Sequence, residues 1–305
     1  MLTGCYIPRA RARFVPPGDV ERAAFCRLFG QILVEADRPP SPEPPRRSTC
    51  DELAVLGFVV VIDRTDRGTF WLVRELEGRE RGAGAYLVRL GRDGGPWAPP
   101  SARAATPGAG PDARRTVSRA AVQCPHAHSD RLTEVIGLDL FLVSSARAYL
   151  QSTVDRHLRG PDGTEADTAH RNDTFFQAAT EALDRQWECG VVLQLHGFDA
   201  GRHPGAAGRF DALLSDGTGQ ASPSQRTMAV GRFLRADPRW SVALCGVDTR
   251  ALAATKNTQG RALNSGGRNL FLHLELSSEL RSREAHLLPL GGVVTEQLSR
   301  LLNSR

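Results

Sequence analysis

From residue 116 onward, short apolar runs typical of strands alternate with longer segments of helical spacing. This alternation is the strongest constraint on the fold, because it predicts a mixed, mostly parallel sheet flanked by helices. We therefore expect residues 116–305 to form a single α/β domain. The expected strands are 116–123, 146–153, 191–195, 240–244 and 269–277, and the expected helices are 133–142, 174–187 (capped by Asp173), 222–234 and 293–302.

Residues 1–115 have a different pattern and predict a small β-rich N-terminal extension. Short strands are expected at 57–62, 69–73 and 85–90, separated by Asp, Arg and Gly turns. A proline-dense stretch at 37–47 predicts a surface loop, and the Gly-, Pro- and Ala-rich stretch 92–115 predicts a linker.

The chain has 305 residues and a net charge of +5, which raises the question of nucleic acid. The basic residues are scattered and Lys256 is the only lysine, a bias typical of a GC-rich bacterial genome rather than of a binding stripe. We expect no nucleic-acid partner. No apolar run has the length of a transmembrane helix.

Six cysteines are present, and none forms a Cys-x-x-Cys pair, which argues against a cysteine-built zinc site. Leu2-Thr3-Gly4-Cys5 resembles a lipoprotein lipobox, although the apolar stretch that normally precedes one is missing. The localisation is left open: we expect a cytoplasmic protein from the sequence as given, and a periplasmic, lipid-anchored one if Cys5 is a true lipobox cysteine. The other interpretation of these four residues is coincidence.

The first candidate site segment contains His126, His128 and Asp130, between an expected strand and an expected helix. Open α/β sheets place their sites at the carboxyl ends of strands. A carboxylate near a helix start stays ionised, which suits a metal ligand. The alternative is that Asp130 only caps the helix and the histidines are surface residues.

Two later strands each contribute a candidate. His196 ends an apolar run and precedes a glycine, so it is placed to project into a cleft. Glu275 alternates with leucines in the strand 269–277, and a carboxylate in so apolar a strand is costly to bury without a role. The alternatives are a hydrogen-bonded histidine and an exposed edge strand.

His170 precedes the helix expected at 174–187 and is a candidate for the same cleft, as a ligand or as a support for one. Together the segments offer one carboxylate, at least two histidines and a further acid. Catalytic zinc sites use three such ligands and leave a position for water, and a nearby glutamate serves as general base.

The order of these motifs, with Gln194-Leu-His-Gly197 and Leu274-Glu-Leu-Ser-Ser-Glu-Leu-Arg281 as the most specific, resembles bacterial poly-γ-glutamate hydrolases. These belong to the zinc carboxypeptidase-like superfamily, near the N-formylglutamate amidohydrolases. The resemblance covers residues 123–281. It implies that His126, Asp130 and His196 bind zinc and that Glu275 is the catalytic glutamate.

The chain departs from the family in several places. The first acid is Asp130 where relatives often have glutamate, and its spacing from His126 is not that of carboxypeptidases, so His128 is an alternative ligand. The family's substrate-binding arginines have no matching motif. Arg147, Arg156 and Arg268 remain candidates, and Asn264 lies in a stretch that resembles one upstream of the family's late strand.

The resemblance therefore implies a zinc-dependent hydrolase that cleaves a peptide or γ-glutamyl-type amide bond. Its substrate is expected to be a small molecule or peptide, and the abundance of arginine favours an acidic one. The alternative is a binding protein that keeps the fold without turnover. The oligomeric state is left open.

Overall fold

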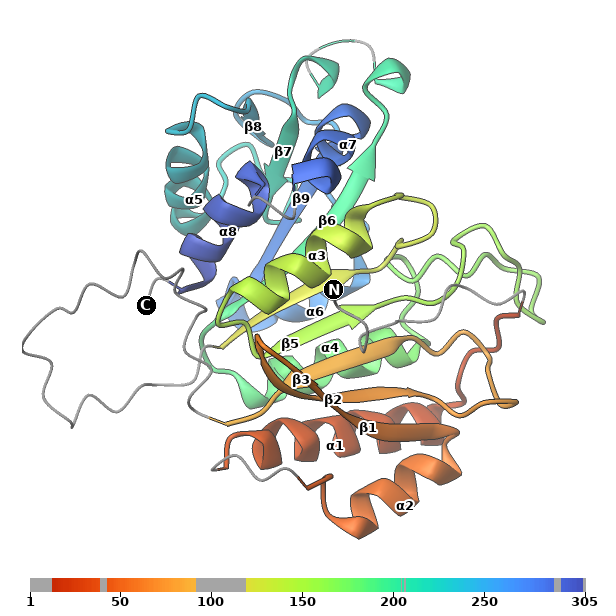
Figure 1. The fold of residues 1–305 in the computed structure, drawn as a ribbon. Coiled ribbons are helices and arrows are strands. Elements are labelled where there is room, and N and C mark those ends of the chain that lie inside the picture. The colour runs from red at the N-terminus through yellow and green to blue at the C-terminus, as the bar shows by residue number, and fades with distance from the viewer. Residues whose placement is uncertain are drawn as a thin grey trace, which may run out of the picture.

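The computed structural model describes residues 13–38, 43–91, 119–203, 205, 207–287 and 292–303. The strands of these residues form one nine-stranded sheet with the order β1-β2-β3-β5-β4-β6-β9-β7-β8 (Figure 1). They are β1 (Phe58–Thr65), β2 (Gly68–Glu75), β3 (Ala85–Arg89), β4 (Ala120–Cys124), β5 (Ala148–Gln151), β6 (Val191–Phe198), β7 (Ala212–Ser215), β8 (Val242–Leu244) and β9 (Phe271–Ser277).

The pairings confirm the expected α/β fold with a mixed sheet. Four neighbouring strands at its centre, in the order β5-β4-β6-β9, are parallel. Antiparallel pairs join this centre to the β1–β3 edge and to β7. Because the central strands are parallel, their carboxyl ends lie at one edge of the sheet, where α/β proteins form their sites.

Helices cover both faces of the sheet (Figure 1). One core contains side chains of α3, α5, α7 and α8, and the other contains side chains of α1, α2, α4 and α6. The helices are α1 (Asp19–Ala36), α2 (Arg47–Val55), α3 (Thr133–Val143), α4 (Phe175–Gln186), α5 (Gln225–Arg235), α6 (Thr258–Asn264), α7 (Ser278–Leu287) and α8 (Val293–Asn303).

Side-chain alternation along β9 separates the apolar core from the polar face. Leu272, Leu274 and Leu276 lie in the core beneath α3 and α8. His273 and Glu275 lie on the opposite face, as the period of two predicts. The same alternation therefore places apolar residues on one side and chemically active residues on the other.

The N-terminal part shares the sheet and the core of the rest of the chain. Its strand β3 pairs with β5, and its helix α1 packs against α4. The three strands expected in this part are present, and two helices that the sequence analysis did not predict, α1 and α2, precede them. Helix α1 carries buried Phe25, Phe29 and Ile32 at helical spacing. The expected boundary at residue 115, the linker 92–115 and Cys5 lie outside the described residues.

Two helix starts differ from the expectation. Thr174, not Asp173, caps α4, because the Thr174 hydroxyl accepts a hydrogen bond from the Gln177 amide while Asp173 binds Arg171. Helix α5 starts at Gln225 with Ser224 as its cap. Strand β7 and helices α6 and α7 were not expected. The other expected strands and helices overlap observed ones with shifted ends.

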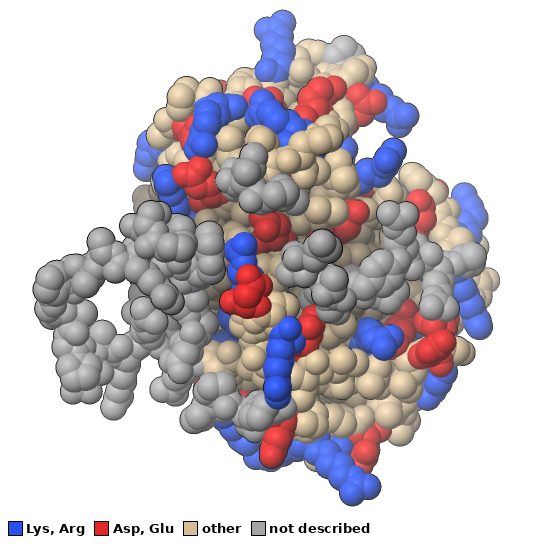
Figure 2. Space-filling model, viewed as in Figure 1, with Lys and Arg blue, Asp and Glu red and all other residues tan. Residues whose placement is uncertain are grey.

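None of the described helices combines the length and the apolar character that crossing a membrane requires. On the face shown in Figure 2, basic side chains are interspersed with acidic ones. The basic residues visible there are thus distributed among charges of the opposite sign.

We predict that Leu274→Ala lowers the free energy of unfolding by about 2–5 kcal/mol, because it leaves a cavity in a fully buried core position. Urea unfolding followed by circular dichroism measures this loss. The control is Val135→Ala on α3, where the side chain is 39% exposed and the expected change is within about 0.5 kcal/mol. Equal effects of the two substitutions would contradict the core assignment.

Candidate metal centre

The candidate site forms where β4, β6 and β9 end side by side. The β6–β9 register places His196 opposite Glu275 and Gln194 opposite His273. His126 follows β4 by two residues, in the turn that leads towards α3. The sheet register therefore brings together side chains from segments that lie far apart in the sequence.

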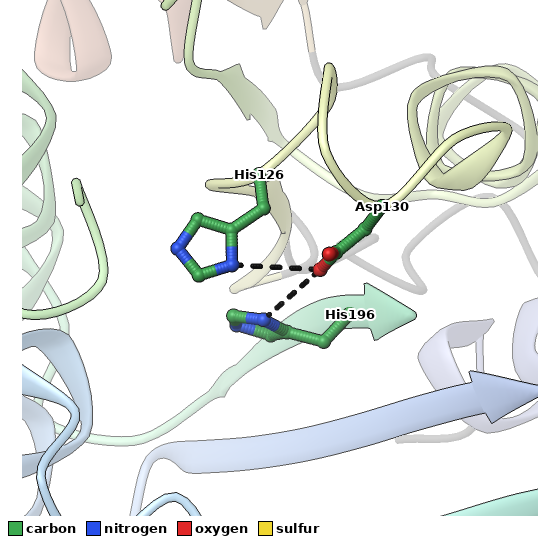
Figure 3. A group of neighbouring side chains, drawn as sticks. All are labelled: His126, Asp130 and His196. Atoms are coloured by element: carbon green, nitrogen blue, oxygen red, sulfur yellow. Dashed lines mark ion pairs between the residues drawn. The ribbon is translucent and has the colours of Figure 1, made fainter. Parts of the chain in front are cut away.

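The carboxylate of Asp130 faces both imidazoles, that of His126 and that of His196 (Figure 3). Its Oδ2 is 3.4 Å from Nδ1 of His126 and 3.4 Å from Nδ1 of His196. The three side chains are buried, and their ligand atoms lie within 4.8 Å of one another. The predicted ligand residues thus converge.

This spacing suits ligands around a shared cation better than a direct hydrogen bond. Hydrogen bonds between nitrogen and oxygen usually span about 2.7–3.2 Å. Two nitrogen or oxygen ligands of a tetrahedral zinc, each roughly 2.0–2.1 Å from the ion, are about 3.3 Å apart. Two imidazoles and one carboxylate are also a donor set that zinc accepts. The residues present therefore fit a zinc ion.

Asp167 holds the far side of the His126 ring. Its Oδ1 is 2.7 Å from Nε2 of His126, and a carboxylate can only accept, so the proton lies on Nε2. The other oxygen accepts hydrogen bonds from Arg156 at 2.6 Å and lies 3.0 Å from Nδ1 of His170. This leaves Nδ1 of His126 as an acceptor, and in the metal-free chain Nη1 of Arg156 donates to it at 3.1 Å.

Glu275 and His273 border the same centre. Together with His196 they form a second buried group whose ligand atoms lie within 4.8 Å of one another. Among the described residues, neither Oε2 of Glu275 nor Nδ1 of His273 has a hydrogen-bond partner. Buried polar atoms are normally paired, so these two atoms mark a place where something else binds.

Burial controls the protonation of this inner group. It raises the pKa of Glu275 to about 8, and the negative charge of Asp130 adds to the rise. Burial lowers the pKa of His196 to about 4. Burial and the neighbouring His196 hold the pKa of His273 well below its usual range. The two histidines are therefore neutral at pH 7, as metal ligands must be.

The pKa values of Asp130 and Asp167 are lowered, in contrast to that of Glu275. Burial alone would raise the pKa of Asp130, but the imidazoles of His126 and His196 hold it well below its usual range. Burial likewise works against ionisation of Asp167, yet His126 and His170 keep its pKa low. Burial alone would lower the pKa of His126, and Asp130 and Asp167 raise it instead. Two ionised carboxylates thus surround His126 and favour a positive charge at this point.

Three further candidates lie near the centre. His128 is half-buried in the same turn as His126, but the converging ligand atoms of the described residues include those of His126 and not of His128. His170 contacts Asp167, which places it behind the ligand His126. Arg156 lies 3.1 Å from Nδ1 of His126 through Nη1, and its side chain is 28% exposed.

The other candidates for substrate binding lie elsewhere in the structure. Arg147 precedes β5, at the opposite edge of the sheet, and binds main-chain carbonyls and Asp37. Arg268 precedes β9 and pairs with Asp184 on α4. Asn264 lies at the end of α6 and donates to the carbonyl of Asp216. Their side chains hold the fold together there.

Sequence reasoning did not single out three residues that touch His126 or His196 or support such a contact. Asp167 binds His126 from a loop 41 positions away. Gln194 contacts His196, and Asn257 contacts Gln194. The position of Gln194 inside an apolar strand was a local sign that this polar side chain has a role. No spacing pattern connects Asp167 or Asn257 to the histidines.

No protein-family model and no curated protein sequence matches the chain. Among solved structures it is similar to an N-formylglutamate amidohydrolase from Ralstonia eutropha JMP134, at 16% identity over 61% of this chain and 93% of that one, with a TM-score of 0.40. It is also similar to tripeptide-bound Csd4, a cell shape determinant of Helicobacter pylori, at 15% identity over 59% and 51% of the chains, with a TM-score of 0.36.

A third similar structure is a Zn-dependent exopeptidase from Parabacteroides distasonis ATCC 8503, at 9% identity over 98% of this chain and 100% of that one, with a TM-score of 0.34. Because these TM-scores lie below 0.5, the interpretation of the site rests on the side chains of this chain.

We predict that Glu275→Gln makes the metal-free protein more stable relative to the wild type at alkaline pH than at acidic pH. The pKa of Glu275 is about 8 in the folded chain against 4.5 for a free glutamate. The protonated group therefore contributes stability that is fully present below about pH 4.5 and lost as the pH rises through about 8. Glutamine stays neutral throughout.

Urea unfolding of both metal-free proteins at about pH 6 and about pH 9 measures this difference, and comparing variant with wild type removes the contribution of other groups. The matched control is Glu279→Gln, an exposed glutamate on α7. A variant-minus-wild-type difference that is the same at both pH values would show that Glu275 is ionised in the apo protein.

Proposed function

We propose that this protein is a zinc-dependent hydrolase that cleaves a peptide or γ-glutamyl-type amide bond. The observation that carries the proposal is the pair of Nδ1 atoms facing one carboxylate oxygen at 3.4 Å, with the unpartnered Oε2 of Glu275 in the adjoining group. A trio of this kind leaves a coordination position for water, which distinguishes catalytic zinc sites from structural ones.

His126, Asp130 and His196 would hold the ion. When bound, zinc lowers the pKa of water towards about 7 and polarises a carbonyl group. The imidazole of His126 is oriented by Asp167 and that of His196 by Gln194, so both rings are held before any metal arrives. The amide of Gly197 donates to Oδ2 of Asp130 and fixes the carboxylate as well.

Glu275 is the proposed general base. Its carboxylate takes a proton from the attacking water and passes it to the leaving amine, which a residue with a pKa near the working pH does efficiently. A pKa of about 8 in the metal-free chain leaves the group largely protonated at neutral pH. With a cation beside it, the ionised form that a base requires is favoured.

Arg156 is the proposed contact for a negatively charged substrate. Its side chain is 28% exposed and its guanidinium lies next to His126, so it joins the buried centre to the surface. A substrate carboxylate, or the oxygen that becomes negative during attack, gains a charge-assisted hydrogen bond there. An acidic peptide or γ-glutamyl compound is thus the proposed substrate class.

We predict that the purified chain binds one zinc ion tightly and that His196→Ala and Asp130→Ala weaken this binding by at least tenfold, because each removes a ligand. Competition with a chelator of known affinity measures the change. The matched control is His203→Ala, since this half-buried histidine lies outside the converging groups. Equal zinc affinity in all four proteins would place the metal elsewhere.

We predict that Glu275→Gln lowers kcat for amide hydrolysis by about 10²–10⁴-fold while zinc stays bound, because the variant has lost its base. Suitable probes are an N-acyl glutamate, a γ-glutamyl dipeptide and an α-linked tripeptide, with Glu279→Gln as the control. Substrate binding without hydrolysis by the zinc-loaded wild type would favour the binding protein that keeps this fold without turnover.

A further inference from the structure

We propose that Gln194, clamped by Gln123, Gln259 and Asn257, is a positioning residue that fixes His196 with its proton on Nε2 and its Nδ1 lone pair towards Asp130. Oε1 of Gln194 lies 2.8 Å from Nε2 of His196. The tautomer of His196 depends on which atom of the Gln194 amide faces the ring. An oxygen accepts a hydrogen bond from a protonated Nε2, whereas an NH2 group would donate to an unprotonated Nε2.

The first clamp begins at the main chain of α4. The Thr180 hydroxyl donates to the carbonyl of Phe176 at 3.0 Å, so it accepts from Nε2 of Gln123 at 2.9 Å. Oε1 of Gln123 is then the acceptor for Nε2 of Gln194, also at 2.9 Å. A carbonyl group cannot donate, so this chain of bonds runs in one direction only.

The second clamp begins at the carbonyl of Thr168. Nε2 of Gln259 donates to it at 3.0 Å, and to Oε1 of Gln177 at 2.9 Å. Oε1 of Gln259 therefore faces Nε2 of Gln194 at 3.3 Å as an acceptor. This second route shares no residue with the first before Gln194, and it gives the same orientation.

The third clamp acts on the other end of the Gln194 amide. The backbone N–H of Gly260 donates to Oδ1 of Asn257 at 2.8 Å, which fixes Nδ2 of Asn257 as the donor to Oε1 of Gln194. A backbone N–H cannot accept, so the Asn257 amide is oriented independently of the other two clamps. Oε1 of Gln194 thus accepts from Asn257 on one lone pair and from His196 on the other.

All four hydrogen-bonding positions of the Gln194 amide are filled. Turning the amide over would place its oxygen against the oxygens of Gln123 and Gln259 and its NH2 group against the NH2 group of Asn257, so these three bonds would be lost whichever nitrogen of His196 carries the proton. Because each clamp ends on a main-chain group of fixed polarity, the amide orientation follows from the backbone. His196 accordingly carries its proton on Nε2.

The clamp occupies the interior between the sheet and helices α4 and α6, where apolar side chains would be simpler to bury. Gln123, Gln194 and Gln259 are fully buried. Buried amides add little net stability even when paired, and leaving one unpaired is costly. We explain so complete a network by its effect on His196, whose ring orientation and tautomer it fixes. Its link to zinc rests on the proposed function, but the tautomer itself is a property of the metal-free chain.

The test is nitrogen NMR of the metal-free protein labelled with ¹⁵N in its histidine rings, at about pH 7. Chemical shifts and couplings to the ring protons distinguish a protonated Nε2 from a protonated Nδ1, and a spectrum of His196→Gln assigns the signal. We expect His196 in the Nε2–H form alone. A protonated Nδ1 would overturn the proposal, whatever the variants show.

Two substitutions separate positioning from bulk packing. Gln194→Leu removes the acceptor, so we expect mixed tautomers and a 10–100-fold loss of zinc affinity. Gln194→Glu keeps an acceptor towards His196 but loses both donors, to Gln123 and to Gln259, so we expect the Nε2–H form to return in a less stable protein. Thr180→Val removes one link of the first clamp only, and the other two clamps should keep the tautomer unchanged in a protein that folds normally.

A Gln194→Leu protein with an unmixed Nε2–H signal and wild-type zinc affinity would also overturn the proposal. If that variant does not fold, the wild-type spectrum and the Gln194→Glu and Thr180→Val proteins still decide it. Failure of the proposed function gives a different result. An inactive protein with the expected tautomer would contradict the hydrolase function but would still support the role of Gln194 in fixing His196.

Discussion

The parallel, in-register pairing of β4, β6 and β9 is the constraint on which the site depends. It places Gln123, Gln194 and His273 in one row across the sheet, and His196 beside Glu275 in another. A slip of one residue would turn these side chains into the apolar core beneath α3. The leucines that alternate with them therefore fix the positions of the polar residues, because burying the leucines permits one register only.

The residues of the site that sequence reasoning found are those whose signal is local. His196 ends an apolar strand, and Glu275 interrupts one, so each was identifiable from its immediate neighbours. The choice between His126 and His128 needed the conformation of the turn. Asp167 and Asn257 reach the site from loops, and only the packing of α4 and α6 onto the sheet brings them there.

The fold shows the same division between local and distant information. Most strands and helices after residue 119 were predictable because their hydrophobic period and flanking turns are strong, whereas β7, α6 and α7 were not predicted. Helix α1 was missed although Phe25 and Phe29 have helical spacing, and its partner α4 lies about 150 residues later. Arg147 and Arg268 were chosen as arginines without a motif. The structure places the buried Arg147 against a main-chain carbonyl and the partly exposed Arg268 against Asp184.

The electrostatics of the centre explain why its residues tolerate burial. Asp130 and Asp167 are ionised around His126, while Glu275 is protonated in the metal-free chain because its own burial and the charge of Asp130 oppose a further negative charge. The hydrogen bonds that orient Gln194 keep the proton of His196 on Nε2, so Nδ1, which faces Asp130, carries none. A divalent cation satisfies these groups at once: it takes the lone pairs that no proton occupies and stabilises the charge that Glu275 must carry to act as a base.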